Sequence, residues 1–302
     1  MPEFDLTRVA LPTGVELDVA VAGRPANPPI ILLHGFPESH WTWRHQIGDF
    51  AKDHFVLAPD QRGFAKSSKP WGVENYTPDK PLADLIALAD RYGIDRFTLA
   101  GHDWGGAIAW MAALNHPGRV ARLIIVNAPH PFIFQKTLFD DMAQRRASQY
   151  ITDWRDPGFE KQVDRLGLSE FFDEHFTRYA DFEKVRGDKT IYLDQWGRPG
   201  AVTAMLNWYR ATPLRVPAMD ATPERPAFLN RPFPPVKMPT LVIWGMDDKS
   251  MLPVQLEGLD SLVPDLTIDR LEGVGHFATW EAPARVTGAM RGWLDARRHT
   301  IP

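Results

Sequence analysis

Short apolar runs alternate with helix-like stretches along the first part of the chain. Near-continuous apolar runs, typical of strands covered on both faces, occur at residues 28–33, 54–59, 96–100 and 121–127. Residues 15–21 begin with alternating apolar and polar side chains, as a half-buried outer strand does. Helices are predicted between these runs, at residues 41–52, 81–92 and 107–114. The alternation predicts an α/β fold with a mostly parallel central sheet flanked by helices.

The pattern changes after about Pro129. From there to about Pro234 no clear buried strand occurs, and the chain predicts polar, aromatic-bearing helices such as Leu168–Phe182 and Gly200–Arg210. A proline-rich return connection closes this stretch. The α/β pattern then resumes, with strands predicted at residues 240–245 and 267–271 and a helix at 282–296. We therefore expect one α/β core in two parts, residues 1–128 and 236–302, with a helical cap at residues 129–235 inserted between them.

Asp103 lies on a tight turn between a predicted strand and a predicted helix. Residues 101–106 read Gly-His-Asp-Trp-Gly-Gly, which is the pattern of a nucleophile elbow with Asp in place of the commoner Ser. Glycine tolerates the backbone angles of such a turn, and a helix N-terminus stabilises a carboxylate. An Asp in a strand-to-helix turn is often only a helix cap, so the rest of the chain must decide between the two interpretations.

A carboxylate that attacks carbon forms an ester, whose hydrolysis needs a base and a second acid that orients it. His276 follows a predicted strand between Gly275 and Phe277, and the acid pair Asp247 and Asp248 follows another strand. The chain order nucleophile, acid, histidine is that of an α/β-hydrolase triad. All three lie at predicted strand ends, where ligands bind in such sheets, and this favours the catalytic interpretation of Asp103.

Composition excludes several other classes. The 302 residues contain no Cys, which removes disulfides, thiolate nucleophiles and Cys-based metal sites. A formal net charge of −4 gives no footprint for nucleic acid or an anionic membrane. No run approaches the ~18 apolar residues of a membrane span, and the N-terminus has no signal-peptide pattern. We expect a cytoplasmic, cofactor-free protein without a metal, and leave open whether it is a monomer or a homodimer.

Four motifs of the chain carry a family resemblance, namely His34-Gly35-Phe36-Pro37-Glu38-Ser39, Gly101-His102-Asp103-Trp104-Gly105-Gly106, Asn207-Trp208-Tyr209-Arg210 and Gly275-His276-Phe277. With them the chain resembles the α/β-hydrolases, and within these the epoxide hydrolases, from about residue 14 to 296. The first and last motifs are shared by many α/β-hydrolases. The Asp elbow restricts the field to epoxide hydrolases and dehalogenases, and the third motif points to epoxide hydrolases.

The resemblance implies that a small epoxide and water are the substrates. Asp103 would attack an epoxide carbon, and two cap tyrosines would protonate the epoxide oxygen. Tyr209 matches one of them by its motif, and Tyr150 matches the other by its place early in the cap. Tyr179 and Tyr192 are the competing candidates.

The remaining roles follow from the same resemblance. Asp248 matches the family's triad acid better than Asp247 does, by its spacing from residues 244–245, and would orient His276. The oxyanion of ester hydrolysis needs N–H donors, for which Phe36 and Trp104 fit. The motifs also place a set of side chains along the expected substrate pocket, namely His34, Pro37, Trp104, Trp208 and Phe277.

Two alternatives stay open. A haloalkane or haloacetate dehalogenase uses the same aspartyl ester but needs N–H donors around a halide, which Trp104 could supply with Trp154, Trp196 or Trp208. Many haloalkane dehalogenases carry Asn where this chain has Phe36. The fold could also serve a ligand receptor without turnover, since fold does not imply function.

Overall fold

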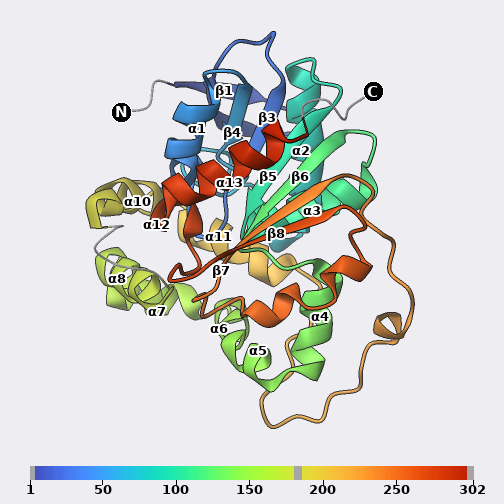
Figure 1. Ribbon diagram of the computed structural model, residues 1–302. Coiled ribbons are helices and arrows are strands. Elements are labelled where there is room, and N and C mark those ends of the chain that lie inside the picture. Colours follow the sequence, from blue (N-terminus) through green and yellow to red (C-terminus); the bar gives the residue numbers. More distant parts are fainter. Residues whose placement is uncertain (1–3, 180–185, 298–302) are drawn as a thin grey trace.

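Eight strands form one sheet in the computed structural model, which describes residues 4–179 and 186–297 (Figure 1). In spatial order the strands are β1 (Asp5–Ala10), β2 (Glu16–Ala22), β4 (Phe55–Pro59), β3 (Pro29–Leu33), β5 (Phe97–His102), β6 (Val120–Val126), β7 (Thr240–Gly245) and β8 (Leu266–Leu271). Strand β2 runs antiparallel to both of its neighbours, and the pairs from β4 to β8 are parallel. The predicted fold class, a mostly parallel sheet with flanking helices, is confirmed.

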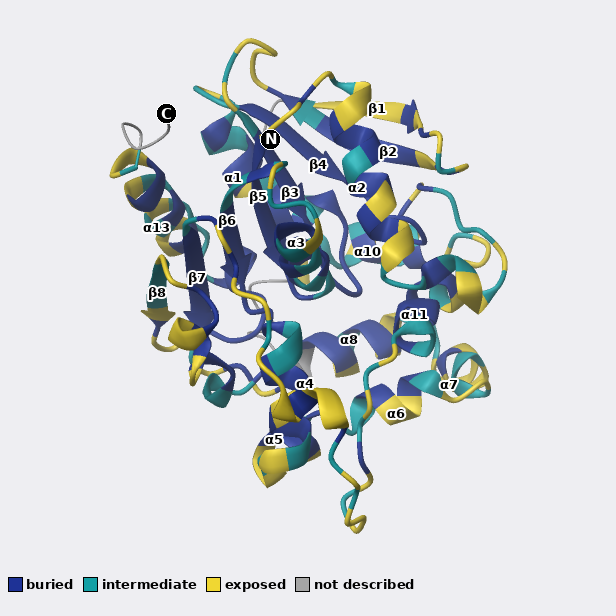
Figure 2. Ribbon diagram, turned by 90° about the vertical axis from the view of Figure 1, so that its right-hand side faces the viewer, coloured by how far each residue is buried: buried dark blue, intermediate teal, exposed yellow. Residues whose placement is uncertain are grey.

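Helices cover both faces of this sheet because alternate residues of each strand point to opposite sides. In β3, Ile30 and Leu32 pack in the layer of α1 (Arg44–Phe50) and α13 (Pro283–Asp295). Ile31 and Leu33 pack in the other layer, which holds α2 (Asp79–Arg91) and α3 (Trp104–Asn115). Figure 2 shows the central strands as buried throughout. The near-continuous apolar runs of the sequence are therefore strands with two covered faces.

Helices also fill the chain between β6 and β7. They are α4 (Pro131–Asp140), α5 (Met142–Ala147), α6 (Tyr150–Arg155), α7 (Phe159–Leu166), α8 (Leu168–Tyr179), α10 (Lys189–Trp196) and α11 (Ala201–Ala211). No strand occurs among the described residues of this segment. The last three residues of the helix predicted over 168–182 lie outside the described residues. Because β6 and β7 are themselves paired, the helical segment leaves the sheet and returns to it at adjacent strands.

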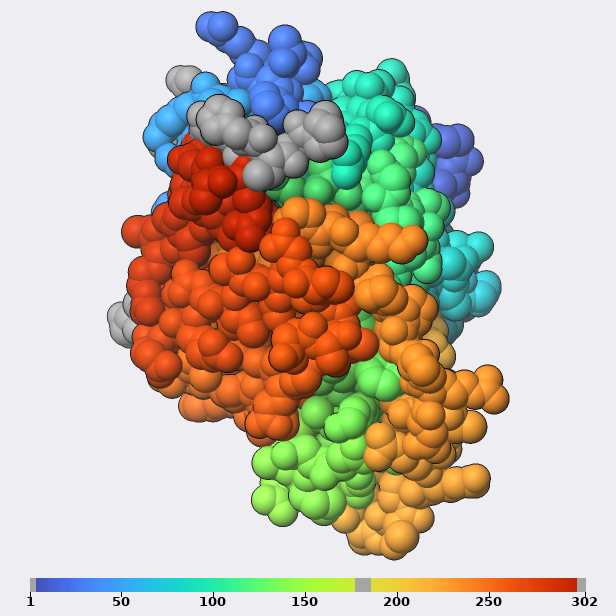
Figure 3. Space-filling view, turned by 45° about the vertical axis from the view of Figure 1, so that its right-hand side comes forward, coloured from blue at the N-terminus to red at the C-terminus, as the bar shows by residue number. Residues whose placement is uncertain are grey.

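Polar contacts fasten this helical segment to the sheet domain. The indole N–H of Trp208 donates to the carbonyl of Arg62 (3.0 Å), and that of Trp196 donates to the carbonyl of Pro37 (2.8 Å). Within the inserted segment itself, Arg225 of the irregular return connection forms an ion pair with Asp140 at the end of α4 (2.6 Å). Figure 3 shows the return connection, in orange, beside the light-green helices at the lower end of the molecule. The domain boundaries at residues 128/129 and 235/236 stay a prediction.

Some elements differ from the sequence prediction. Strand β1 was not predicted, because it lies at the sheet edge with all of its residues but Val9 exposed and so lacks an apolar run. The helix predicted at residues 41–52 begins as a 3₁₀ turn, His40–Trp43, before α1. The short helix α12 (Ala278–Glu281) precedes α13. Among the described residues, none of the helices combines the length and apolar content that a membrane crossing requires.

Gly105 lets α3 approach β3 closely, and this suggests a test. A Cβ at residue 105 would overlap the backbone carbonyls of Leu33 and His34. We expect Gly105→Ala to lower the free energy of unfolding by about 1–3 kcal/mol, the usual cost of overpacking. Gly292→Ala in α13, where an added Cβ meets nothing within 4 Å, should instead raise it by about 1 kcal/mol. Urea denaturation of both variants measures the difference, and equal effects would contradict the packing argument.

Candidate active site

The predicted functional residues meet at one edge of the sheet because parallel strands end together there. Asp103 follows β5, Asn127 follows β6, Asp248 follows β7 and His276 follows β8. The loop that begins with His34 follows β3, which is the neighbour of β5. Residues far apart in the sequence are therefore adjacent in the fold.

Asp103 has a strained backbone that aims its carboxylate at the loop after β3. Its φ of 49° and ψ of −121° are unusual for a residue other than Gly, and such conformations cost roughly 1–3 kcal/mol. The carboxylate oxygen Oδ1 accepts a hydrogen bond from the N–H of Phe36 (2.7 Å). Gly35 permits this contact, because a Cβ there would overlap the Asp103 side chain. The other oxygen, Oδ2, is left facing His276.

The imidazole of His276 lies between two carboxylates. Its Nδ1 is 2.7 Å from Oδ2 of Asp248, and its Nε2 is 3.6 Å from Oδ2 of Asp103. The first distance is a strong hydrogen bond, and the second is an ion-pair distance longer than a hydrogen bond. All three side chains are buried. The arrangement has the geometry of a nucleophile, a base and an orienting acid.

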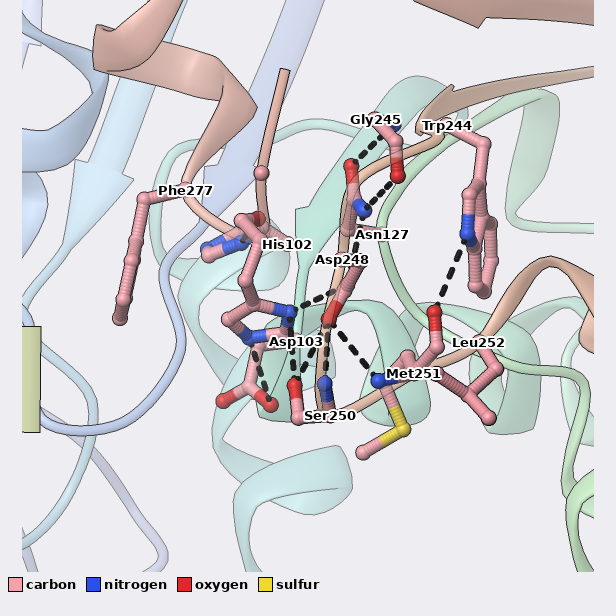
Figure 4. Close-up of polar contacts among 12 residues, drawn as sticks. His102, Asp103, Asn127, Trp244, Gly245, Asp248, Ser250, Met251, Leu252 and Phe277 are labelled. Carbon is pink, nitrogen blue, oxygen red and sulfur yellow. Dashed lines mark hydrogen bonds and ion pairs between the residues drawn. The ribbon is translucent and has the colours of Figure 1, made fainter. Parts of the chain in front are cut away.

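Asp248, and not its neighbour Asp247, contacts the histidine. Asp247 is exposed, whereas Asp248 is 2% exposed and its two oxygens are fully engaged. Oδ1 accepts from the N–H and hydroxyl of Ser250 and the N–H of Met251. Oδ2 accepts from Nδ2 of Asn127 (2.9 Å) as well as from His276. Figure 4 shows Asp248 surrounded by these donors.

Asn127 was missed by the sequence analysis although it ends the strand predicted at residues 121–127. Its amide group joins two strand ends, because Oδ1 accepts from the N–H of Gly245 (2.9 Å) while Nδ2 donates to Asp248. Asn127 thus holds the loop after β7 in place beside β6. A polar residue directly after a buried apolar strand was the signal that could have identified it.

Charge interactions shift the pKa values of His276 and Asp248. Burial alone would lower the pKa of His276, but the negative charges of Asp248 and Asp103 outweigh it and hold the pKa well above 6.5. Burial would likewise raise the pKa of Asp248, but the charge of His276 and the hydrogen bonds keep it below its ordinary value. The two carboxylates therefore both favour a proton on the imidazole of His276.

A small cavity of about 10 Å³ lies at Asp103. Its lining brings both predicted tyrosines together with Asp103 and His276, and consists of Phe36, Asp103, Tyr150, Trp154, His175, Tyr209, Ser250 and His276. The rings of Tyr150 and Tyr209 are 6.2 Å apart between centroids. Of the competing tyrosines, Tyr192 is fully buried against Phe172 and Phe176 outside this lining, and the side chain of Tyr179 lies outside the described residues.

The five residues expected to line the pocket are not in this lining, although all are close to it. His34 is fully buried, and its Nε2 accepts from the N–H of Gln61 while Nδ1 contacts the carbonyl of Gly35, so it fixes the loop. The carbonyl of Pro37 accepts from the indole of Trp196 in the helical segment, and the indole of Trp208 donates to the carbonyl of Arg62 in the sheet domain. Phe277 is fully buried behind His276.

Trp104 lies beside the cavity rather than in its lining. Its half-buried ring packs edge-on against Tyr209, at 5.1 Å between centroids. It is the first residue of α3, so its N–H belongs to the first helical turn, whose N–H groups have no helical acceptor. The backbone of Trp104 therefore suits the predicted donor role, while its side chain supports Tyr209.

A buried ion pair beside His276 was also not predicted. Nδ1 of His102 donates to Oε2 of Glu38 (2.8 Å), and Nε2 contacts the carbonyl of His276 (2.9 Å). Trp280 donates to the other oxygen of Glu38. Burial would raise the pKa of Glu38, but the charge of His102 and these hydrogen bonds lower it. The pair fixes the backbone of His276.

Comparison with known proteins agrees with this geometry. Residues 28–283 match the family model described as the alpha/beta hydrolase fold. The AB hydrolase superfamily protein YfhM of Bacillus subtilis is 34% identical over 93% of this chain and 95% of its own length. Epoxide hydrolase A of Mycobacterium tuberculosis is 31% identical over 93% of this chain and 94% of its own.

A solved structure extends the comparison to three dimensions. It comes from work on novel epoxide hydrolases of the alpha/beta hydrolase superfamily in metagenomes from hot environments. It is 47% identical, covers 97% of this chain and 99% of its own, and superposes with a TM-score of 0.89. The chain therefore belongs to the epoxide hydrolases of the alpha/beta-hydrolase superfamily.

Proposed function

We propose that this hydrolase opens epoxides to vicinal diols through a covalent ester on Asp103. The observation that carries the proposal is the single buried cavity that holds Asp103, His276 and two tyrosines, with Asp248 behind the imidazole. A nucleophile, a base and proton donors on one small cavity are what epoxide hydrolysis requires. The name of the Mycobacterium tuberculosis relative and the source of the solved structure support the same reaction.

In the first step the free oxygen Oδ2 of Asp103 attacks an epoxide carbon. The carbon–oxygen bond of the ring breaks, and the departing oxygen takes a proton from Tyr150 or Tyr209. The product is a hydroxyalkyl ester of Asp103 and a tyrosinate. The hydrogen bond from Phe36 holds Oδ1 and so leaves Oδ2 free for the attack.

In the second step His276 takes a proton from water, whose oxygen attacks the ester carbonyl carbon. Negative charge develops on Oδ1, where the N–H of Phe36 already points and the N–H of Trp104 would add a second donor. Collapse expels the alkoxide, which takes the proton from His276. The second proton of the water leaves the regenerated Asp103 carboxyl and restores the tyrosine, so that epoxide and water give a diol.

The electrostatics favour His276 as the base of the second step. The negative charges of Asp248 and Asp103 both raise the pKa of its imidazole. Ester formation removes the charge of Asp103 and so lowers that pKa, and a proton held by the imidazole passes to solvent water before the second step begins. The neutral imidazole can then act as the base that hydrolysis needs.

His276→Gln should trap the ester. Ring opening does not need the base, so the variant should gain the mass of one styrene oxide on the peptide that contains Asp103. Its turnover should fall by at least about a hundredfold, the usual contribution of a general base. Mass spectrometry after digestion measures the adduct, and His276→Gln combined with Asp103→Ala should show none. Absence of the adduct from the single variant, with diol still formed, would refute the covalent mechanism.

Two assays on the unaltered chain separate the proposal from its alternatives. Incubation with styrene oxide should yield the diol, and incubation with 1-chlorobutane should release no chloride. Chloride release in place of diol would indicate a dehalogenase. Binding of either compound without turnover would indicate a receptor.

Tyr209→Phe and Tyr150→Phe should each slow ester formation by about a hundredfold, because the epoxide oxygen loses an acid. Rapid-quench measurement of the ester isolates this step from hydrolysis. Tyr192→Phe is the matched control, since its buried hydroxyl has no hydrogen-bond partner among the described residues and lies outside the cavity lining. An unchanged rate in both cavity variants would reject the assigned role.

Asp248→Asn should lower the pKa of His276, because a negative charge next to the imidazolium is removed. Asp247→Asn should leave that pKa unchanged, because Asp247 is exposed. NMR titration of the His276 Cε1–H signal, assigned by its loss in His276→Gln, measures both. A larger decrease in the Asp247 variant would show that the acid has been misassigned.

A further inference from the structure

A second cavity opens next to the catalytic one, between α6, α7 and α8. Its volume is about 730 Å³, which falls in the range of small-molecule sites. Figures 1 and 2 show these three helices next to one another, away from the sheet. Three residues line both cavities, namely Tyr150, Trp154 and His175. The two cavities therefore meet at this shared wall, which we call the neck.

The inner cavity has room for little more than the reacting group. Its volume of about 10 Å³ has room for about one water molecule. Its walls are tightly packed, with ring centroids of Phe36 and Trp154 4.6 Å apart, and those of Trp154 and Tyr209 4.8 Å apart. Tyr209 in turn packs against Trp104. A substituent on the far side of the epoxide would have to displace this aromatic cluster, which is costly in a close-packed interior.

The outer cavity has the opposite character. Its inner wall is apolar, formed by Trp154, Phe159, Val163 and Phe171, while exposed polar side chains such as Gln162 and Glu174 lie at its rim. Aromatic and aliphatic walls of this kind favour an apolar group that leaves water. The neck residue His175 contacts the rings of both Trp154 and Phe171, so the apolar wall continues to the catalytic cavity.

We propose that the outer cavity binds the one large apolar substituent of a terminal epoxide, whose ring reaches Asp103 through the neck. This inference rests on the proposed function and names its substrate class. Epoxides with a single aryl or long alkyl substituent fit both cavities at once. Epoxides substituted on both carbons place their second group against the closed wall of Phe36 and Tyr209.

Two isomeric epoxides, which differ only in the position of the epoxide ring, test the proposal. 1-Octene oxide has its epoxide at the chain end, and trans-4-octene oxide has a propyl group on each epoxide carbon. We expect kcat/KM to favour the terminal isomer by at least about tenfold, since a misplaced apolar group in a closed pocket has effects of that size. Equal values, or a preference for the internal isomer, would overturn the proposal.

Leu166→Trp tests the location of the substituent. Leu166 lines the outer cavity and is 38% exposed, so a larger side chain can be placed there without disturbing the core. We expect kcat/KM for 1-octene oxide to fall about tenfold, with little change for the short 1-butene oxide. Met142→Trp is the matched control, because Met142 is an exposed apolar residue of α5 outside this lining. No loss in the Leu166 variant, or equal losses for both substrates, would contradict the assignment.

Binding of octanamide, an unreactive mimic with a terminal polar group, separates this inference from the reaction itself. Calorimetry should show binding to the unaltered chain, with affinity about tenfold weaker in Leu166→Trp and unchanged in Met142→Trp. If no epoxide is hydrolysed but this pattern appears, the proposed function fails and the binding site stands. If epoxides are hydrolysed but Leu166→Trp binds octanamide normally, the outer-cavity assignment fails.

Discussion

The site depends on an imidazole placed between two buried carboxylates. Burying three charged groups in a protein interior is costly unless each has partners. Asp248 meets this cost with a complete set of donors, and Asp103 does so with the N–H of Phe36 and the charge of His276. The whole edge of the sheet is organised to supply these partners. A change at any strand end that moves one donor would therefore alter the charge balance of the other groups.

The parallel sheet makes this charge arrangement possible. Residues after β5, β6, β7 and β8 reach one another only because those strands end at the same edge. Asn127 links two of these ends directly, and the pair of His102 and Glu38 holds the backbone of His276 from behind. The side chains of the proposed reaction thus stand at the ends of rigid strands, with supporting contacts that fix their orientation. Preorganised charges of this kind need no rearrangement as the reaction proceeds.

The helical segment contributes the acids of the proposed reaction and is fixed to the sheet accordingly. Arg155 of α6 donates to the carbonyl of Tyr209 in α11 (2.9 Å), so the helices of the two cavity tyrosines are joined to each other. Trp208, next to Tyr209, is hydrogen-bonded to the loop after β4. These contacts hold Tyr150 and Tyr209 opposite Asp103. The insertion between two paired strands is what allows a separate helical layer to face the strand ends.

The sequence predicted the parts of the site that local pattern controls. Glycines around Asp103 and His276, each after an apolar strand, were sufficient to place those two residues. Spacing from residues 244–245 favoured Asp248 over Asp247 through the family resemblance, but the donors that hold Asp248, Asn127 and Ser250, were not predicted. His34 and Phe277 follow strand ends, but their side chains turn into the core and lie outside the lining of the cavity at Asp103. Trp154 was considered only for a halide site, and His175 not at all, because their places arise from helix packing.

In the proposed reaction the division between the two cavities separates the selection of a substrate from its chemistry. The inner cavity is lined by Asp103, His276 and the two tyrosines proposed as acids, so a change in its shape would also affect the reaction. Most residues of the outer cavity, such as Val163 and Leu166, belong to α6, α7 and α8 and contact none of the three triad side chains through any hydrogen bond or ion pair among the described residues. Substitutions there can alter the volume available to a substituent while the charges around His276 stay in place. The neck of Tyr150, Trp154 and His175 lines both cavities, so in the proposed reaction these side chains have two tasks: they admit the substituent and they close the inner cavity around the epoxide.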